Sequence, residues 1–465
     1  MRKYLLILFV SCAALSSLWA QSATPAASDS SILAVDEFYT LVVQNHPLAL
    51  QARLIRAQAD AERLKASGAF DPKLFSDVSQ KYFDEKEYFQ LQNSGVEIPA
   101  WFGFKAKAGY ELNEGLFLNN QNTVPGSGLW YADLSLTLGK GLFIDQRRAM
   151  LKQARLLQEA AEFEVLTAYN NLLEEALKSY WNWHQSYQTV QVYQNALEAA
   201  QFRFNGVKQQ AIVGDKPLVD TLEAAIQVQD RQLKLQKAQA DFITQSNTLE
   251  TFLWLDGVVP LELKAGTTPL FENPALVNLP QDWLINHPIL NAKSLKIDRL
   301  DIAQRLNREA LKPQVDLSYK FLNQPTTNDF FAEYAINNYS WAVTASFPLF
   351  LRKERGEIAK TEVKIQEAEL DLDLKRLEVN NKVEALQQEF RLTTQQLLEM
   401  RSMVNNYQRL LRAENIKFQN GESSLFLINS RELKYLDSQE KLIQLEAKVN
   451  QIQAKLRAAA GVLAP

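Results

Sequence analysis

The chain has 465 residues, a formal net charge of −4 at pH 7, a sequence pI near 5.7 and one cysteine. The acidic balance and the absence of a basic block exclude the electrostatic footprint of a nucleic-acid-binding protein. Because Cys12 is the only cysteine and lies near the N-terminus, the rest of the chain can form neither disulfides nor thiolate metal sites.

Residues 1–20 have the features of a cleavable export signal. Arg2 and Lys3 give a positive start, and a short apolar core follows. A membrane anchor matches less well, because serines interrupt the apolar run and it falls short of the roughly 20 residues of a membrane span. Lipid attachment at Cys12 is an alternative that the apolar residues after it disfavour. We expect the small, polar residues 21–32 to form a disordered leader.

The tripeptide Asn-His-Pro occurs twice. At 45–47 it separates two helical stretches, because proline fits the first turn of a helix and disfavours helical geometry in the residue before it. It recurs at 286–288, and 286 minus 45 gives an offset of 241. An internal duplication explains this recurrence. The expected divisions are a first repeat at 33–256, a linker or equatorial segment at 257–280, and a second repeat at 281–465.

After each of these breaks the apolar pattern changes from helical to alternating. In the second repeat, alternation within 314–348 predicts two strands of about nine or ten residues, the length of a tilted membrane strand. In the first repeat, alternation within 73–138 leaves two strands or four open. The repeats later come back into register at an offset of 207, and 241 minus 207 leaves an excess of 34 residues in the first repeat, about one more hairpin with its loop.

Two stretches predict helices far longer than a globular domain needs. From Val379 to Leu411, apolar residues follow one another at alternating spacings of four and three, which is the seam of a coiled coil. Each long helix ends in a turn that contains glycine, and a shorter helix returns, so the predicted shape is a rod of paired coils. The expected long and returning helices are 145–204 and 217–255 in the first repeat, and 351–418 and 425–460 in the second.

These residues together resemble the TolC-like outer-membrane efflux proteins. The resemblance is carried by the signal, by the two copies of helix, strands, long helix and returning helix, by Phe347-Pro-Leu-Phe350 with the basic stretch after it, and by the turn that begins at Gly214. It implies a mainly α fold with a β-barrel portion, in which transmembrane strands form a shared trimeric barrel above a long coiled-coil helical tunnel.

The same resemblance implies location in the outer membrane, with a periplasmic helical extension. The implied partners are two further copies of the chain in a homotrimer, a periplasmic adaptor protein, an inner-membrane transporter and outer-membrane lipid, without cofactor or nucleic acid. A physical argument agrees, because four or six strands from one chain cannot close a barrel around a lumen. Three chains give twelve or eighteen strands.

We therefore expect an outer-membrane channel component of a tripartite efflux or type I secretion system. A periplasmic adaptor is one alternative, but it should contain a β-rich lipoyl-like module and a single helical hairpin. A structural coiled-coil protein is another, and it does not explain the amphipathic strands. An enzyme is not expected, because His46 and His287 precede prolines at equivalent breaks and are best interpreted as local structure.

The turns between long and returning helices hold the candidate site residues. The resemblance implies an adaptor contact at Gly214, Asp215, Gly421 and Glu422. It also implies that acidic residues six and nine positions after the turn glycine narrow the periplasmic mouth. In this chain these are Asp220 and Glu223, whereas the second repeat has Leu427 and Ser430. Three copies would form an acidic channel gate that favours cations, unless the two acids only stabilise the start of their helix.

Overall fold

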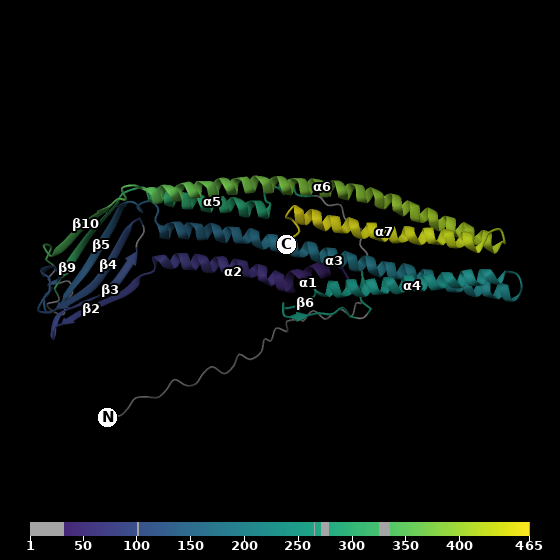
Figure 1. Cartoon of the computed structure of the whole chain (residues 1–465), viewed down its shortest axis with the longest axis horizontal. Coiled ribbons are helices and arrows are strands. Elements are labelled where there is room, and N and C mark those ends of the chain that lie inside the picture. Colours follow the sequence, from purple (N-terminus) through teal and green to yellow (C-terminus); the bar gives the residue numbers. More distant parts are fainter. Residues whose placement is uncertain (1–31, 100–101, 265, 271–278, 325–334, 465) are drawn as a thin grey trace, which may run out of the picture.

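The computed structural model describes residues 32–99, 102–264, 266–270, 279–324 and 335–464. The molecule is elongated, with a β-sheet at one end and a rod of helices beyond it (Figure 1). The predicted signal at 1–20 lies outside the described residues, as does the predicted leader except for Ile32, which belongs to the short strand β1 (Ile32–Leu33). None of the described helices is both long and apolar enough to cross a membrane.

The first repeat opens with two short helices, α1 (Val35–Asn45) and α2 (Pro47–Ser67). Between them His46 has extended backbone geometry, and its ring Nδ1 accepts a hydrogen bond from the backbone N–H of Leu48 at 3.1 Å. His46 therefore caps α2, and Pro47 occupies the first turn, where no N–H is needed.

The long helix α3 (Gln146–Ile212) begins at Asp145, whose carboxylate accepts a hydrogen bond from the backbone N–H of Arg148 at 2.8 Å. It continues to Ile212, past the predicted end at 204. The reason is tertiary packing, because Phe204 and Val207 belong to a cluster with residues of three other helices.

The returning helix α4 (Leu218–Glu250) ends before the predicted 255, since Trp254–Leu255 form strand β6, which pairs with β7 (Val259–Pro260).

The second repeat has the same order of helices. They are α5 (Pro288–Glu309), α6 (Arg352–Gln419) and α7 (Leu425–Ala459). Between the repeats, β8 (Thr268–Pro269) pairs in parallel with β1, which fixes part of the predicted linker to the start of the first repeat.

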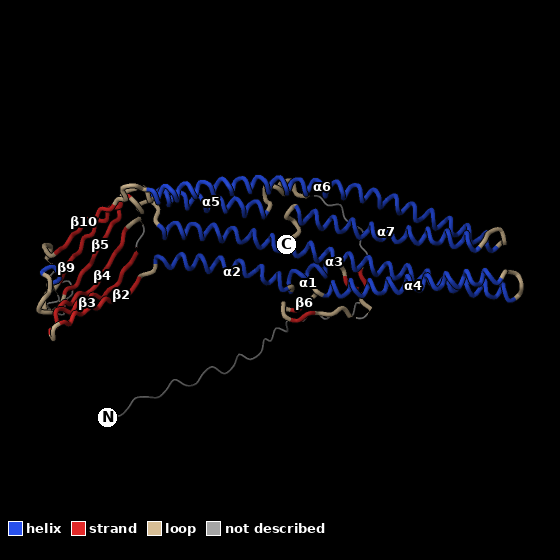
Figure 2. Tube along the Cα trace, in the orientation of Figure 1, coloured by secondary structure: helices blue, strands red, loops and turns tan. Residues whose placement is uncertain are grey.

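The rod is one layer of helices packed side by side (Figures 1 and 2). Near the sheet the order is α2, α3, α5, α6, and in the far half it is α4, α3, α7, α6. Thus α2 and α4 follow one another along α3, and α5 and α7 follow one another along α6. The largest core lies where α1 meets α3, with Phe38, Tyr180 and Trp183 fully buried.

Within the described residues the sheet has six strands, four from the first repeat and two from the second. They are β2 (Lys73–Phe83), β3 (Lys86–Pro99), β4 (Phe104–Glu114), β5 (Leu129–Gly139), β9 (Gln314–Asn323) and β10 (Tyr339–Ser346). Their order is β10-β9-β5-β4-β3-β2, and every neighbouring pair is antiparallel. Of the two alternatives for the first repeat, four strands is the observed one.

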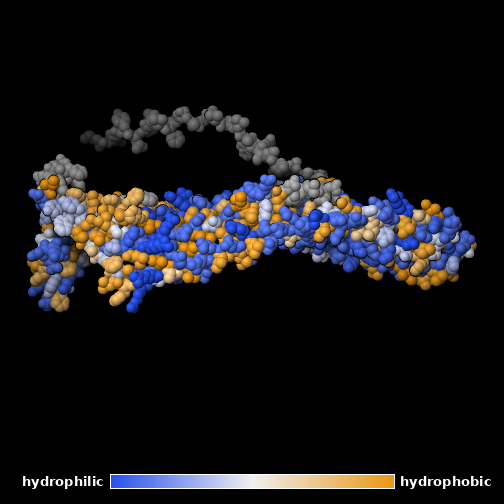
Figure 3. All heavy atoms as spheres, turned by 90° about the horizontal axis from the view of Figure 1, so that it is seen from above, coloured by the Kyte–Doolittle hydropathy of each residue, from blue (hydrophilic) through white to orange (hydrophobic). Residues whose placement is uncertain are grey.

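The two faces of the sheet differ in polarity. One face, here called the apolar face, carries Leu134, Tyr319 and Trp341, which are cross-strand neighbours. The opposite, polar face carries Asp133 and Lys320, also neighbours. Figure 3 shows apolar residues gathered over part of the sheet end and again near the far end of the helices. Strands whose side chains alternate between an apolar and a polar face are typical of a barrel wall between lipid and water.

Candidate functional site

The two turns at the far end of the rod have the same backbone geometry (Figure 1). Gly214 and Gly421 have φ values of +87° and +80°, in the left-handed region that favours glycine. The backbone N–H groups of Asp215 and Glu422 each donate to the carbonyl five residues back, at 2.9 and 2.8 Å. This is a common helix-ending motif. The structure therefore brings the four predicted turn residues to one end of the molecule.

The two turns also contact one another. The Nζ atom of Lys216, in the first turn, lies 4.7 Å from the centre of the Phe418 ring beside the second turn. Val207, Ala224 and Leu425, from α3, α4 and α7, form a small buried cluster next to them. The far end is thus a packed unit that joins both repeats.

Ionic contacts join α3, α4 and α7 close to the far-end turns, on the side toward the sheet. Glu432 on α7 is 4% exposed, and it accepts hydrogen bonds from Arg203 on α3 at 2.8 and 3.1 Å. It also accepts one from Arg231 on α4, which is 1% exposed, at 3.5 Å. Arg231 contacts Asp230 as well, at 2.5 Å. We call Arg203, Asp230, Arg231, Asn429 and Glu432 the three-helix network.

The predicted gate residues lie at the edge of this network. The Oε1 atom of Glu223 accepts a hydrogen bond from the Nδ2 of Asn429 at 3.0 Å, and Asn429 in turn accepts one from Arg203 at 3.3 Å. Asp220 lies in the first turn of α4 and is half-buried, as is Glu223. The structure therefore links Glu223 to the second repeat, and it does not bring Asp220 and Glu223 to a shared partner.

Sequence reasoning missed Arg203, Arg231 and Glu432. A signal for Arg231 was present, because it lies between Val228 and Leu235 at seam spacing, in a position where a coiled coil normally has an apolar residue. Almost all fully buried charges are paired. A charge in a seam position therefore predicts an opposite charge on a neighbouring helix, but not which one.

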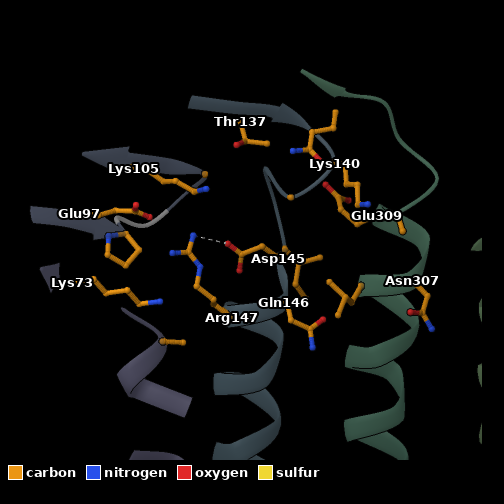
Figure 4. A pocket seen from close by; sticks show the side chains of 18 residues that line it. Lys73, Glu97, Lys105, Thr137, Lys140, Asp145, Gln146, Arg147, Asn307 and Glu309 are labelled. Atoms are coloured by element: carbon orange, nitrogen blue, oxygen red, sulfur yellow. Dashed lines mark hydrogen bonds and ion pairs between the residues drawn. The ribbon is translucent and has the colours of Figure 1, made fainter. Parts of the chain in front are cut away.

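A second candidate site is a cavity of about 600 Å³ at the junction of the sheet and the helices. Figure 4 shows Lys73 and Lys105 on one side and Lys140 and Glu309 on the other. Between them Arg147 forms an ion pair with Asp145 at 3.3 Å (dashed in Figure 4). The Oε1 atom of Glu309, a residue only 6% exposed, has no hydrogen-bond partner among the described residues. The walls of the cavity carry four cationic and three acidic side chains.

The histidines have structural surroundings. Burial lowers the pKa of His184 to about 4, and it also lowers the pKa of His46 and of His287. The Nε2 atom of His287 lies 3.1 Å from the carbonyl oxygen of Ala459, so this ring connects the start of α5 to the end of α7. In the described part of the chain, no three His, Cys, Asp or Glu residues are placed to hold a metal ion.

The sequence profile of the family described as outer membrane efflux protein matches residues 111–253 and 279–462. The chain belongs to the outer membrane efflux protein family. This efflux-family protein is accordingly an outer-membrane protein whose helices extend into the periplasm. The predicted fold class, mainly α with long helices and a smaller β portion, is also confirmed.

Several solved structures resemble it over nearly the whole chain. The CmeC outer membrane channel of Campylobacter jejuni has a TM-score of 0.66 at 12% identity, with 92% of this chain and 86% of that chain covered. The MtrE outer membrane channel of Neisseria gonorrhoeae has 0.66 at 12%, with 92% and 89% covered. The outer membrane protein VceC of Vibrio cholerae has 0.63 at 15%, with 92% and 95% covered. At these identities the likeness shows the fold alone. No curated protein matches the chain in sequence.

Proposed function

We propose that this protein is the outer-membrane channel component of a tripartite efflux or type I secretion system. Three copies form one passage, which receives substrates from an inner-membrane transporter and a periplasmic adaptor and releases them outside. One observation carries the proposal: two helices, α3 and α6, run without interruption from a sheet with one apolar and one polar face to the far-end turns (Figure 1). Membrane wall and periplasmic tunnel are thus one continuous structure.

The assembly of several copies is supported by surfaces that one chain leaves uncovered. Strands β2 and β10 are the two edges of the open sheet, and an unpaired edge cannot persist in lipid. On α6, four exposed apolar side chains follow at spacings of seven, four and three, which is a coiled-coil seam that no described residue of the same chain covers. They are Val363, Leu370, Leu374 and Leu377. A neighbouring copy would cover both surfaces.

The far-end turns are the proposed contact for the adaptor. Next to Gly214 and Asp215, the first turns of α4 expose Leu218 and Leu222, at 81% and 62%. Beside Gly421 and Glu422, Phe426 is 68% exposed. Apolar side chains grouped at a tip without a covering element are typical of a protein contact site. These turns are at the end farthest from the sheet, where an adaptor in the periplasm meets the channel.

We place the channel gate at the same end, at Asp220 and Glu223. They lie one helical turn apart on the same face of α4, so three copies would hold six carboxylates around the axis. Carboxylates that lie close together repel one another and attract cations. The hydrogen bond from Asn429 holds Glu223 in place within its own chain.

The proposed function is tested by deleting the gene in its own host and measuring sensitivity to toxic compounds, secretion of polypeptides and accumulation of cargo. We expect a defect in one cargo class, restored by the wild-type gene, and no catalytic turnover by the purified protein. The affected class would separate efflux from polypeptide secretion. A deletion strain that matches its parent in compound sensitivity, secretion and cargo accumulation would refute the proposal.

A further inference from the structure

The number of strands distinguishes the two repeats. The second repeat contributes one hairpin to the sheet, β9–β10, whereas the first contributes two, β2–β3 and β4–β5. We call β2–β3 the extra hairpin. It follows α2 in the chain and occupies one edge of the sheet, so the two outermost strands are β2 on that side and β10 on the other. The diameter of the proposed barrel therefore depends on whether the extra hairpin forms part of its wall.

The polar face shows that the extra hairpin is integrated into the sheet. Lys73, Glu97, Lys107, Asp133 and Lys320 are successive cross-strand neighbours on β2, β3, β4, β5 and β9. Their charges alternate, and opposite charges directly across a strand pair are stabilising. Lys107 lies 3.8 Å from Glu97, which is on the extra hairpin. We call these five residues the charge row.

The apolar face of the sheet also continues across the extra hairpin, in the row of residues adjacent to the charge row. Cross-strand neighbours here form an apolar row over all six strands, including both strands of the extra hairpin. The row consists of Leu74, Val96, Ala108, Ala132, Phe321 and Tyr339. Beyond it, Ser76 and Ser94 bond to each other at 2.8 Å, and Gln80 faces Gln90 closer to the tip of the hairpin. The apolar band of the hairpin is therefore nearest to the helices.

A side-chain link spans the boundary between the extra hairpin and the other strands. The hydroxyl of Tyr131 on β5 donates to the Oδ1 of Asn93 on β3 at 2.9 Å, and so crosses over β4. The crossing requires Gly109 on β4, because a Cβ there would lie 2.7 Å from the Tyr131 hydroxyl oxygen. Tyr131 is 4% exposed although it lies on the polar face. Removing the hairpin from the wall would break this link as well as the pairing of β3 with β4.

We propose that three copies of the chain close a barrel of eighteen strands, in which β2 of each copy pairs with β10 of the next. This inference rests on the proposed channel function. All six strands alternate in direction, so β2 and β10 are antiparallel and the ring closes without a change in pairing type. At a spacing of about 4.8 Å and a tilt of about 40°, eighteen strands give a backbone cylinder about 36 Å across, against about 24 Å for twelve. The extra hairpin makes the barrel about half as wide again.

The competing arrangement is a barrel of twelve strands with the extra hairpin outside the wall. In that barrel β10 would pair with β4 of the next copy, because β4 would become the edge. Cysteine cross-linking separates the two arrangements, because the sequence has a single cysteine, Cys12, which belongs to the predicted export signal at 1–20. Ala342→Cys on the polar face of β10 is combined with one cysteine on the polar face of β2, at Phe75, Asp77 or Ser79. The matched set on β4 uses Lys105, Lys107 or Glu111.

After oxidation of outer membranes, we expect linked dimers and trimers on non-reducing gels from at least one β2 pair and from no β4 pair. Linkage through β4 without linkage through β2 would overturn the eighteen-strand barrel. So would a protein that is trimeric by mass and links through neither set. A protein that is monomeric by mass would instead refute the assembly on which the proposed function rests, so the two failures are distinguishable.

Discussion

At the scale of single residues, the three-helix network places a buried charge between the repeats. Glu432 is the carboxylate that both Arg203 and Arg231 contact. Glu432→Gln would leave Arg231 with only Asp230, which is partly exposed, and breaking a buried ion pair costs about 3 kcal/mol or more. We expect a lower melting temperature by circular dichroism in detergent and a higher conductance in planar bilayers, because the far end would open more easily.

A matched control for this variant is Glu198→Gln. Glu198 is on the same long helix as Arg203, is exposed, and has no ion pair among the described residues. Its replacement should change the free energy of unfolding by less than about 0.5 kcal/mol. If both variants melt at the wild-type temperature, the network does not stabilise the far end.

The proposed gate gives a second prediction. Replacing Asp220 and Glu223 together by alanine should raise single-channel conductance or lessen block by divalent cations, without loss of assembly, because up to six carboxylates leave the axis. Asn429→Ala is the matched variant, since it frees Glu223 but keeps both acids. We expect it to loosen the tip while cation block remains. Unchanged conductance, selectivity and block in the double variant would mean that these acids only stabilise the start of α4.

The buried histidine on α3 predicts a pH dependence of stability. Burial lowers the pKa of His184 to about 4, so the folded protein keeps this ring neutral at a pH where the unfolded chain, with an ordinary pKa near 6.5, binds a proton. The contribution of the neutral His184 ring to the free energy of unfolding is fully present above about pH 6.5, and it is lost progressively as the pH falls toward 4. Between pH 7.5 and 5 the loss is about 2 kcal/mol.

The measurement is the melting temperature in detergent across this pH range, compared between wild type and His184→Gln. His46 and His287, whose pKa values burial also lowers, contribute in the same direction and remain in the variant. The variant should therefore show a shallower decline than wild type. Parallel declines would show that protonation of His184 does not limit stability.

At the scale of elements, two glycines with similar backbone geometry should tolerate alanine very differently. Gly139 has φ +77° and ends β5, where an added Cβ would lie 2.0 Å from the carbonyl oxygen of Pro313. Gly214 has φ +87° but open space around it. Gly214→Ala should cost only the left-handed strain of about 1–2 kcal/mol. Gly139→Ala should cost more, because the backbone beside β9 has to move.

The extent of β-structure and the temperature at which it is lost, both by circular dichroism, would test this pair. We expect Gly139→Ala to reduce the yield of folded protein in the outer membrane, and Gly214→Ala to fold normally. Equal behaviour of the two variants would contradict the close approach of β5 to the segment before β9.

The long helices could be predicted from the sequence because coiled-coil spacing is a local pattern. The end of α3 could not, since Phe204 and Val207 remain helical through contacts with α4 and α7. The strand count stayed open because alternation in β2 and β3 is interrupted by serine and glutamine, and only pairing with β4 shows that they belong to the sheet. The turn geometry at Gly214 and Gly421 follows from local sequence, and the gate role of Asp220 and Glu223 stays a prediction. Glu432 and its arginines could not be predicted, because they depend on contacts between repeats.

At the scale of the whole molecule, the two predicted repeats supply corresponding elements to the sheet and to the rod of helices. Each repeat contributes hairpins to the sheet, one long helix through the rod and one returning helix at the far end (Figure 2). The repeats are joined side by side by β5 with β9 and by α3 with α5 and α7. What remains uncovered is the pair of outer edges, β2 with α2 and α4 on one side and β10 with α6 on the other.

The mass of the particle extracted from the outer membrane in mild detergent, measured by native mass spectrometry, tests this account most directly. The open sheet edges and the exposed seam on α6 require neighbouring copies, so we predict a particle of three chains with its full β-content. A stable single chain with the same β-content, extracted from the same membrane, would contradict the account.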